Sequence, residues 1–226
     1  IVLMENAARE VSKICIRELE NIREPKVIIF AGKGNNGGDG FALARLLNDQ
    51  GIECQIAFLF EKSKFSEDAE INYNIAVKCG LKIITNFTEA IIETGRADIV
   101  VDAVFGTGIS RPVEGIYASV VEIINNYAKK VISIDIPSGV NSDDGRIMGA
   151  AVEADITVTF ALPKIGMLLY PGASCCGKIE IANISIQPST IAGMNLKTAF
   201  LDIKDVYDIL PERKKRTNKG SYGRLF

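Results

Sequence analysis

The sequence predicts an α/β fold with a mainly parallel central sheet covered by helices on both faces. Short, near-continuous apolar segments alternate with longer amphipathic segments along most of the 226 residues. This alternation is typical of parallel strands joined by crossover helices. The composition, 47% hydrophobic and 24% charged residues, is ordinary for a globular chain that is long enough to bury a full core.

The elements follow from hydrophobic periodicity and from turn residues. Helices are expected at 2–22, about 38–48, 66–78, 88–93 and 113–127. Strands are expected at 26–31, 53–60, 81–84, 98–105 and 131–136. Pro25 ends the first helix, Ser66 is a plausible N-cap, and the glycine-rich segment 32–40 is expected to be a turn. Beyond Gly139 two further strands, 155–160 and 178–184, follow without long helices between them.

Composition excludes several classes of protein. The net charge is −2 and the basic residues are spread along the chain. The sequence as a whole therefore lacks the excess of positive charge that is typical of a nucleic-acid-binding protein. No apolar run approaches the roughly 20 residues that span a bilayer, and we expect a cytoplasmic protein, although a chain that begins with Ile1 leaves targeting open. Five cysteines without C-x-x-C spacing argue for reduced thiols. With no histidine, acid–base chemistry must fall to Asp, Glu, Lys, Tyr or Cys.

The strongest motif is the segment GNNGGDG at 34–40, placed between a strand and a helix. Ligands bind at the carboxyl ends of parallel strands, where glycines allow close approach to a phosphate and a helix presents free N–H groups. Asparagine amides can donate to phosphate or offer an oxygen to a cation. A tight turn without a ligand is the alternative, but five glycines within 32–40 exceed what a turn needs. The spacing matches neither the dinucleotide fingerprint nor a Walker loop.

Two more strands are expected to end in acidic groups. Asp102 lies near the end of an apolar strand, and a buried carboxylate is costly unless it is paired or bound to a cation. Asp135 ends the next strand, within the motif DIPSG. A structural role explains either residue alone. A structural role does not readily explain why three strands that end at the same edge of the sheet all carry polar groups there. The three motifs together therefore predict one shared crevice at this edge.

A weaker candidate is the segment ADITVTFALPKIG, which contains Asp155, Lys164 and Gly166. Lys164 follows a strand and a proline, so it can reach the crevice as a cation for a phosphate or an amide. A surface lysine explains the pattern nearly as well.

Taken in order, GNNGGDG, DAVFGTG, DIPSG and ADITVTFALPKIG, with MENAA at 4–8, resemble the YjeF N-terminal domain family over roughly 1–205. The resemblance implies a three-layer, Rossmann-like αβα fold. It also implies an NAD(P)H-hydrate epimerase, an isomerase that interconverts the R and S epimers of hydrated NADH or NADPH and uses a potassium ion.

The resemblance also implies site residues. The glycine-rich motif and Asp135 are expected to contact the substrate, through Asn35, Asn36, Gly37, Gly38, Asp39 and Asp135. The loop after the Asp102 strand is expected to do the same, through Gly106, Thr107, Gly108, Ile109, Ser110, Arg111 and Pro112. Potassium is expected on Asn36, Asp102 and Ser138. We expect Asp135 to be catalytic, because no histidine exists and Asp102 suits the cation better.

The domain prediction is an epimerase domain over 1–210, followed at 211–226 by a linker and the start of a truncated second domain. The string NKGSYGR resembles the opening of a ribokinase-like, ADP- or ATP-dependent NAD(P)H-hydrate dehydratase, with Asn218 where that motif usually has histidine. A solvated basic tail is the alternative. Rival functions are a non-catalytic, nucleotide-binding interaction module and a dehydrogenase or methyltransferase. A homo-oligomer is a fair expectation for such a domain.

Overall fold

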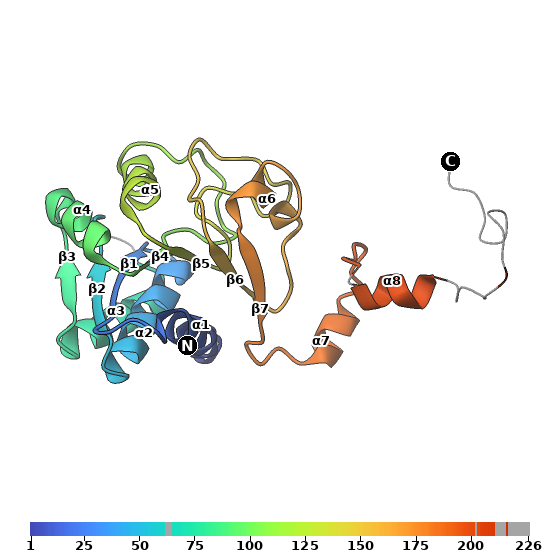
Figure 1. Ribbon diagram of the computed structural model, residues 1–226, viewed down its shortest axis with the longest axis horizontal. Coiled ribbons are helices and arrows are strands. Elements are labelled where there is room, and N and C mark those ends of the chain that lie inside the picture. The colour runs from blue at the N-terminus through green and yellow to red at the C-terminus, as the bar shows by residue number, and fades with distance from the viewer. Residues whose placement is uncertain (62–64, 202, 211–215, 217–226) are drawn as a thin grey trace. The chain divides into compact units, whose positions relative to one another are not determined.

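The computed structural model describes residues 1–61, 65–201, 203–210 and 216. Internal contacts divide the chain into two units, Ile1–Ser185 and Ile186–Phe226. The first unit holds the whole sheet (Figure 1). The second contains helix α7 (Pro188–Gly193) and helix α8 (Ile203–Ile209), neither of which has a buried residue. The predicted linker and second-domain segment at 211–226 lies outside the described residues except for Arg216.

The described residues form one seven-stranded sheet in the order β3-β2-β1-β4-β5-β6-β7. The strands are β1 (Lys26–Ala31), β2 (Glu53–Ala57), β3 (Lys82–Ile84), β4 (Ile99–Ala103), β5 (Val131–Ile134), β6 (Ile156–Phe160) and β7 (Lys178–Ala182). All neighbouring strands pair in parallel, which confirms the predicted α/β fold. The chain runs outward from β1 on one side and from β4 on the other, so the order reverses between these two central strands. Ligands of open α/β sheets bind at such a reversal.

Helices cover both faces of the sheet. They are α1 (Val2–Leu19), α2 (Asn35–Asp49), α3 (Glu67–Lys78), α4 (Phe87–Arg96) and α5 (Ile116–Tyr127), with a short 3-10 turn η1 (Ile165–Met167) and α6 (Gly172–Cys175) near the end of the unit. Helices α1 to α3 lie on one face, and α4 and α5 on the other (Figure 1). This is the expected three-layer arrangement. The absence of long helices beyond Gly139 in the first unit is confirmed as well.

The structure corrects the predicted turn at 32–40, because α2 already begins at Asn35. The glycines near its start face protein rather than open space. A Cβ on Gly37 would lie 1.9 Å from the carbonyl oxygen of Gly32, and one on Gly40 would lie 2.7 Å from the Cβ of Ala103 in β4. Gly37 and Gly40 therefore allow the helix to pack tightly against the strand ends.

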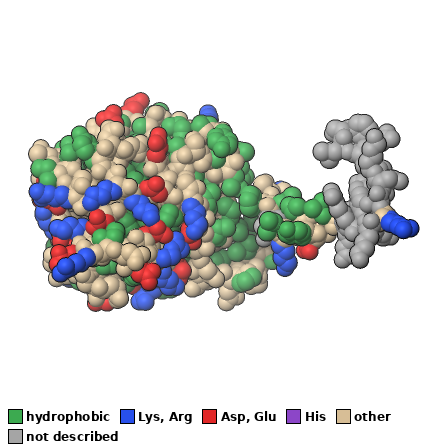
Figure 2. All heavy atoms as spheres, viewed as in Figure 1, with side chains coloured by type: hydrophobic (Ala, Val, Ile, Leu, Met, Phe, Trp, Pro, Cys, Tyr) green, Lys and Arg blue, Asp and Glu red, His purple; other side chains and the backbone are tan. Residues whose placement is uncertain are grey.

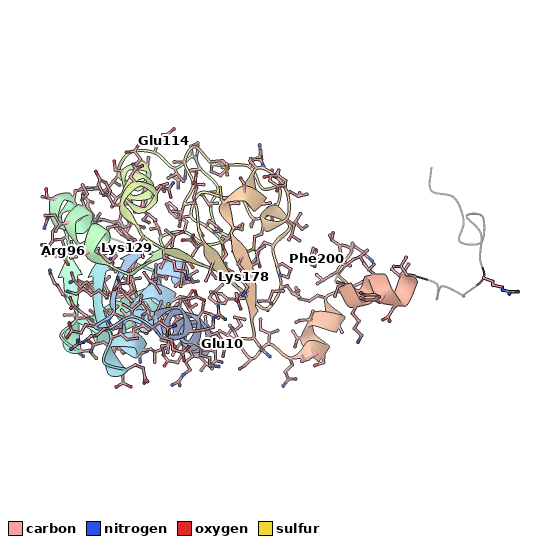
Figure 3. All side chains as sticks on the ribbon, in the orientation of Figure 1. Glu10, Arg96, Glu114, Lys129, Lys178 and Phe200 are labelled. Atoms are coloured by element: carbon pink, nitrogen blue, oxygen red, sulfur yellow. The ribbon has the colours of Figure 1, made fainter. Side chains whose placement is uncertain are left out.

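The amino-terminal edge of the sheet is closed by structural carboxylates. Asp98 accepts hydrogen bonds from the Lys26 N–H and the Lys129 ammonium, and Lys129 lies beside Arg96 (Figure 3). Asp155 likewise accepts from the Val131 N–H at 2.7 Å. Asp155, one of the weaker sequence candidates, thus lies at the edge opposite the predicted crevice.

The outer surface carries charges of both signs. Figure 2 shows Lys and Arg interleaved with Asp and Glu on the viewed face of the first unit, without a large patch of one sign. Most of the described basic side chains of the first unit belong to ion pairs, such as Arg45 with Glu5 and Lys178 with Glu180. No helix among the described residues is long and apolar enough to cross a membrane.

Candidate functional site at the carboxyl edge of the sheet

A cavity of about 440 Å³ opens at the carboxyl ends of β1, β4 and β5, where the strand order reverses. It is lined by Lys33, Gly34, Asn35, Asn36, Asp39, Val104, Phe105, Gly106, Thr107, Gly108, Ile109, Tyr117 and Asp135. The lining comes from the start of α2, the loop after β4, helix α5 and the residue after β5. The three predicted motifs therefore meet in one crevice.

The loop after β4 is tied to both of its neighbours through the main chain of Phe105. The Asn36 amide donates to the Phe105 carbonyl at 2.9 Å, and the Phe105 N–H donates to the Ser138 hydroxyl at 2.8 Å. The Ser138 hydroxyl in turn donates to Asp102 at 2.6 Å. The three residues expected to bind potassium thus belong to one hydrogen-bonded chain.

Asp102 is completely buried at the end of β4. Its oxygens accept from the Ser133 hydroxyl, from the Ser138 N–H and hydroxyl, and at 3.3 Å from the Val104 N–H. Desolvation raises the pKa of Asp102, and the hydrogen bonds from Ser138, Ser133 and Val104 oppose that rise. This carboxylate holds the ends of β4 and β5 together and does not line the cavity.

One buried oxygen beside the cavity has no partner. The Asn36 side chain is 7% exposed, and its Oδ1 accepts no hydrogen bond from any described residue, although its Nδ2 is engaged. A buried acceptor without a partner costs about 1–3 kcal/mol and commonly marks a position for an ion or water. The groups linked to Asn36 by the hydrogen-bonded chain, namely Asp102, the Ser138 hydroxyl and the Phe105 carbonyl, also offer oxygen donors. Such a set suits a hard cation such as potassium, whereas no three Cys, Asp or Glu side chains of the described residues cluster as a metal site.

Asp135 is held in a strained backbone conformation at the cavity wall. Its φ is +68°, and the Ile136 N–H donates across it to the Ile134 carbonyl, which forms a γ-turn. A non-glycine residue in this region costs roughly 1–3 kcal/mol, and such residues cluster at functional sites. The turn ends β5 at Ile134, two residues earlier than predicted, and directs Asp135 into the cavity.

Lys164 reaches Asp135 from the segment after β6. Its ammonium pairs with the Asp135 carboxylate and also donates to the Thr159 hydroxyl at 2.8 Å and the Phe160 carbonyl at 3.2 Å. Both charged side chains are mostly buried, 19% and 14% exposed. Lys164 is therefore not a surface lysine, and it acts behind Asp135 rather than in the cavity lining.

Asp39 is the second carboxyl group in the cavity. It is 8% exposed and makes no hydrogen bond or ion pair to any described residue. Burial raises the pKa of Asp39 well above its ordinary value, and the negative charge of Asp135 raises it further. The site therefore holds two carboxyl groups in different environments, one in an ion pair and one without a partner.

The predicted site residues fall into two groups. Those that line the cavity are Asn35, Asn36, Asp39, Gly106, Thr107, Gly108, Ile109 and Asp135. Gly37 and Gly38 face inward instead, and a Cβ on Gly38 would lie 2.5 Å from the Met4 methyl. The remaining loop residues Ser110, Arg111 and Pro112 are exposed and do not line the cavity.

Sequence reasoning missed four side chains of the cavity lining, Lys33, Val104, Phe105 and Tyr117. Tyr117 stacks on Phe60 at 4.5 Å and lies 4.8 Å from Phe105, so an aromatic group forms one wall. Lys33 directly precedes the motif GNNGGDG, and Val104 and Phe105 lie within DAVFGTG, so their positions in the sequence could have identified them. Tyr117 lies in an ordinary amphipathic helix, and nothing in its pattern distinguishes it from a core residue.

A second, more polar hollow of about 330 Å³ lies between α1, the end of α2 and the segment after β7. Its charged lining side chains include Arg9, Lys13 and Glu10, and the ammonium of Lys13 pairs with Glu10. Of the recognised motifs only MENAA contributes to it, through Asn6.

Comparison with known proteins gives consistent results. The model of the family described as YjeF-related protein N-terminus matches residues 1–166. A protein of Oenococcus oeni named NAD(P)H-hydrate epimerase is 41% identical over 82% of this chain and 86% of its own length. The bifunctional NAD(P)H-hydrate repair enzyme Nnr of Moorella thermoacetica is 37% identical over the whole chain, which spans only 44% of that enzyme. A yeast crystal structure shares the fold, with a TM-score of 0.74, 20% identity, and coverage of 90% of this chain and 87% of the yeast chain.

Proposed function

The chain belongs to the YjeF-related N-terminal family, and from this membership we propose that it is an NAD(P)H-hydrate epimerase, which interconverts the R and S epimers of hydrated NADH or NADPH. The names of the similar proteins support this activity. The observation that carries the proposal is the convergence of Asn36, Asp39 and Asp135 on one cavity at the strand-order reversal.

The chemistry of the substrate explains why acidic groups are needed. The hydrate carries its hydroxyl on the ring carbon next to the ring nitrogen, so that carbon is a hemiaminal. It can invert by losing and regaining hydroxide or by ring opening. Both routes place positive charge on the ring and require a proton on the departing oxygen.

In this proposal Asp135 is the catalytic carboxylate. Its strained turn and its ion pair with Lys164 hold it in one orientation against the cavity, so it is positioned to oppose the positive charge that develops on the ring. The start of α2, with its N-terminal N–H groups and Lys33 beside it, faces the same cavity and suits the phosphates of a nucleotide.

We propose potassium as the cation of this site. Asn36, Asp102 and Ser138 would hold it together with the Phe105 carbonyl, and the unpartnered Asn36 oxygen supports this. The ion would neutralise phosphate charge and stabilise the loop after β4. If so, potassium should raise the thermal midpoint of the wild-type chain at fixed ionic strength. Asn36→Ala should lose this increase and Asn35→Ala, in the same helical turn, should keep it; an increase retained by Asn36→Ala would exclude this ion site.

An epimerisation assay tests the function. One purified epimer of hydrated NADH is mixed with the chain, and the approach to the epimer equilibrium is followed by chromatography against the uncatalysed rate. We expect wild-type acceleration and a loss of about 10²–10³-fold in Asp135→Asn, because the group that opposes the positive charge on the ring is removed. Asp143→Asn, which removes an exposed loop carboxylate, is the matched control. Full activity in a folded Asp135→Asn would refute the role of Asp135.

The same assay addresses the alternative function, a nucleotide-binding interaction module without catalysis. Such a module would bind the hydrate and leave the epimerisation rate at its uncatalysed value. The similar proteins named as enzymes favour catalysis.

Beyond this domain, we propose that the full-length protein also carries an ADP- or ATP-dependent dehydratase, because bifunctional relatives match over the whole chain and extend further. We also propose a homo-oligomer in the cytoplasm. The five unpaired cysteines, four of them buried, are consistent with a reducing compartment.

A further inference from the structure

We propose that Asp39 is the proton donor of the epimerisation, acting in its neutral acid form, while Asp135 acts only as a charged group. This inference rests on the proposed function and assigns the two carboxyl groups of the cavity to separate roles. The two carboxyl groups differ in their surroundings, since Asp135 is in an ion pair and Asp39 has no partner among the described residues.

The first observation is the isolation of Asp39. The side chain is more than nine-tenths buried and lines the cavity, yet no described residue donates a hydrogen bond to it or pairs with it. A buried carboxylate without a partner is strongly disfavoured relative to the neutral acid. A neutral acid can instead donate its O–H into the cavity, where the substrate would be the acceptor.

The second observation is the position of the charges around Asp39. Asp135 and Lys33 line the same cavity as Asp39. The amino group of Ile1 lowers the pKa of Asp39, but this is the smallest of the three effects, and that group pairs with Asp68 at 2.7 Å. The Lys164 ammonium is committed to Asp135. Burial and Asp135 therefore outweigh the nearby positive charge and favour the neutral acid.

Two carboxyl groups with diverging environments in one cavity are a recognised basis for separate acid and charge-stabilising roles. The step balances as follows. The Asp39 proton moves to the substrate hydroxyl, and the C–O bond breaks with its electron pair on oxygen. A water molecule departs, and the ring that remains beside Asp135 is an iminium ion. Water then adds to the opposite face of the ring and releases its proton to solvent, and the Asp39 carboxylate regains a proton from solvent on its own face.

The experiment compares Asp39→Asn, Asp39→Glu and the control Asp49→Asn, an exposed carboxylate at the far end of the same helix. Each chain is assayed for epimer interconversion at saturating hydrated NADH and for binding of the hydrate by fluorescence titration. Asparagine has the shape of the neutral acid but cannot supply its proton. We therefore expect Asp39→Asn to lose about 10²–10⁴-fold in kcat with binding changed less than about fivefold. Asp39→Glu should regain part of kcat, and Asp49→Asn should match wild type.

The pH profile of the unaltered chain is a second readout and needs no variant. Because the acid form is the active one, kcat should be constant at low pH and fall as pH rises through the raised pKa of Asp39. The residual rate of Asp39→Asn should lack that fall.

The outcomes separate the two claims. If the wild-type chain is no faster than the uncatalysed reaction, the proposed function fails. If wild type is active but Asp39→Asn stays within about threefold of its kcat, Asp39 is not the proton donor. If Asp39→Asn loses binding and kcat together, and Asp39→Glu restores neither, Asp39 only binds substrate and the inference is overturned.

Discussion

At the residue scale, the site contains three features that oppose stability. Asn36 has an unpartnered buried oxygen, Asp39 has an unpartnered buried carboxyl group, and Asp135 has a left-handed backbone conformation. Each costs free energy in the folded chain. They occur in one cavity, where a ligand can supply the missing partners, and this is the pattern expected of a site shaped for function rather than for stability.

The stability cost of Asp39 should depend on pH. The pKa of Asp39 is raised in the folded chain above its value in the unfolded chain. Below the ordinary Asp pKa the side chain is neutral in both states and costs the folded chain no stability. As pH rises from there through the raised pKa, the free energy of unfolding falls. Asp39→Asn does not titrate. We therefore expect its free energy of unfolding to match wild type at low pH and to exceed it increasingly as pH rises.

Urea unfolding of both chains across this pH range measures the difference, and Asp49→Asn serves as the control. An advantage of Asp39→Asn that is constant with pH, or that shrinks as pH rises, would contradict the assigned environment of Asp39.

At the element scale, periodicity predicted the strands and helices in the right order, and the three strand ends that form the site. Strand ends were placed too late at β4 and β5, because the apolar run continues past the last paired residue. At β5 a γ-turn centred on Asp135 ends the strand, and hydrophobicity carries no signal for such a turn.

The start of α2 was the larger error. Glycines lower helix propensity, so the segment reads as a turn, yet Gly37, Gly38 and Gly40 lie in the helix because nothing larger fits against Gly32, Met4 and Ala103. That requirement is tertiary. It becomes visible only when the helix, the loop and the strand are placed together.

This packing makes a prediction for α2. Gly37→Ala would place a methyl group against the Gly32 backbone, so we expect a loss of about 1–3 kcal/mol in the free energy of unfolding, with reduced epimerase activity. Gly95→Ala, in α4 with open space around it, should instead gain up to about 1 kcal/mol. Chemical denaturation measures both variants, and equal effects would contradict close packing as the role of Gly37.

At the scale of the whole molecule, the sheet topology explains where the site lies. Chain order reverses between β1 and β4, so the loops after these strands diverge to opposite faces and leave a cavity at the carboxyl edge. The opposite edge is occupied by structural ion pairs such as Asp98 with Lys129. The cavity, the sheet and the hydrophobic core all belong to the first unit.

The position of substrate and ion tests this arrangement most directly. Crystals of Asp39→Asn soaked with hydrated NADH and rubidium, whose anomalous signal replaces that of potassium, would locate both. We expect the rubidium peak in contact with Asn36 Oδ1 and the hydrated ring between residue 39 and Asp135. A nucleotide bound instead in the hollow lined by Arg9 and Lys13, or an ion remote from Asn36, would contradict the proposed site.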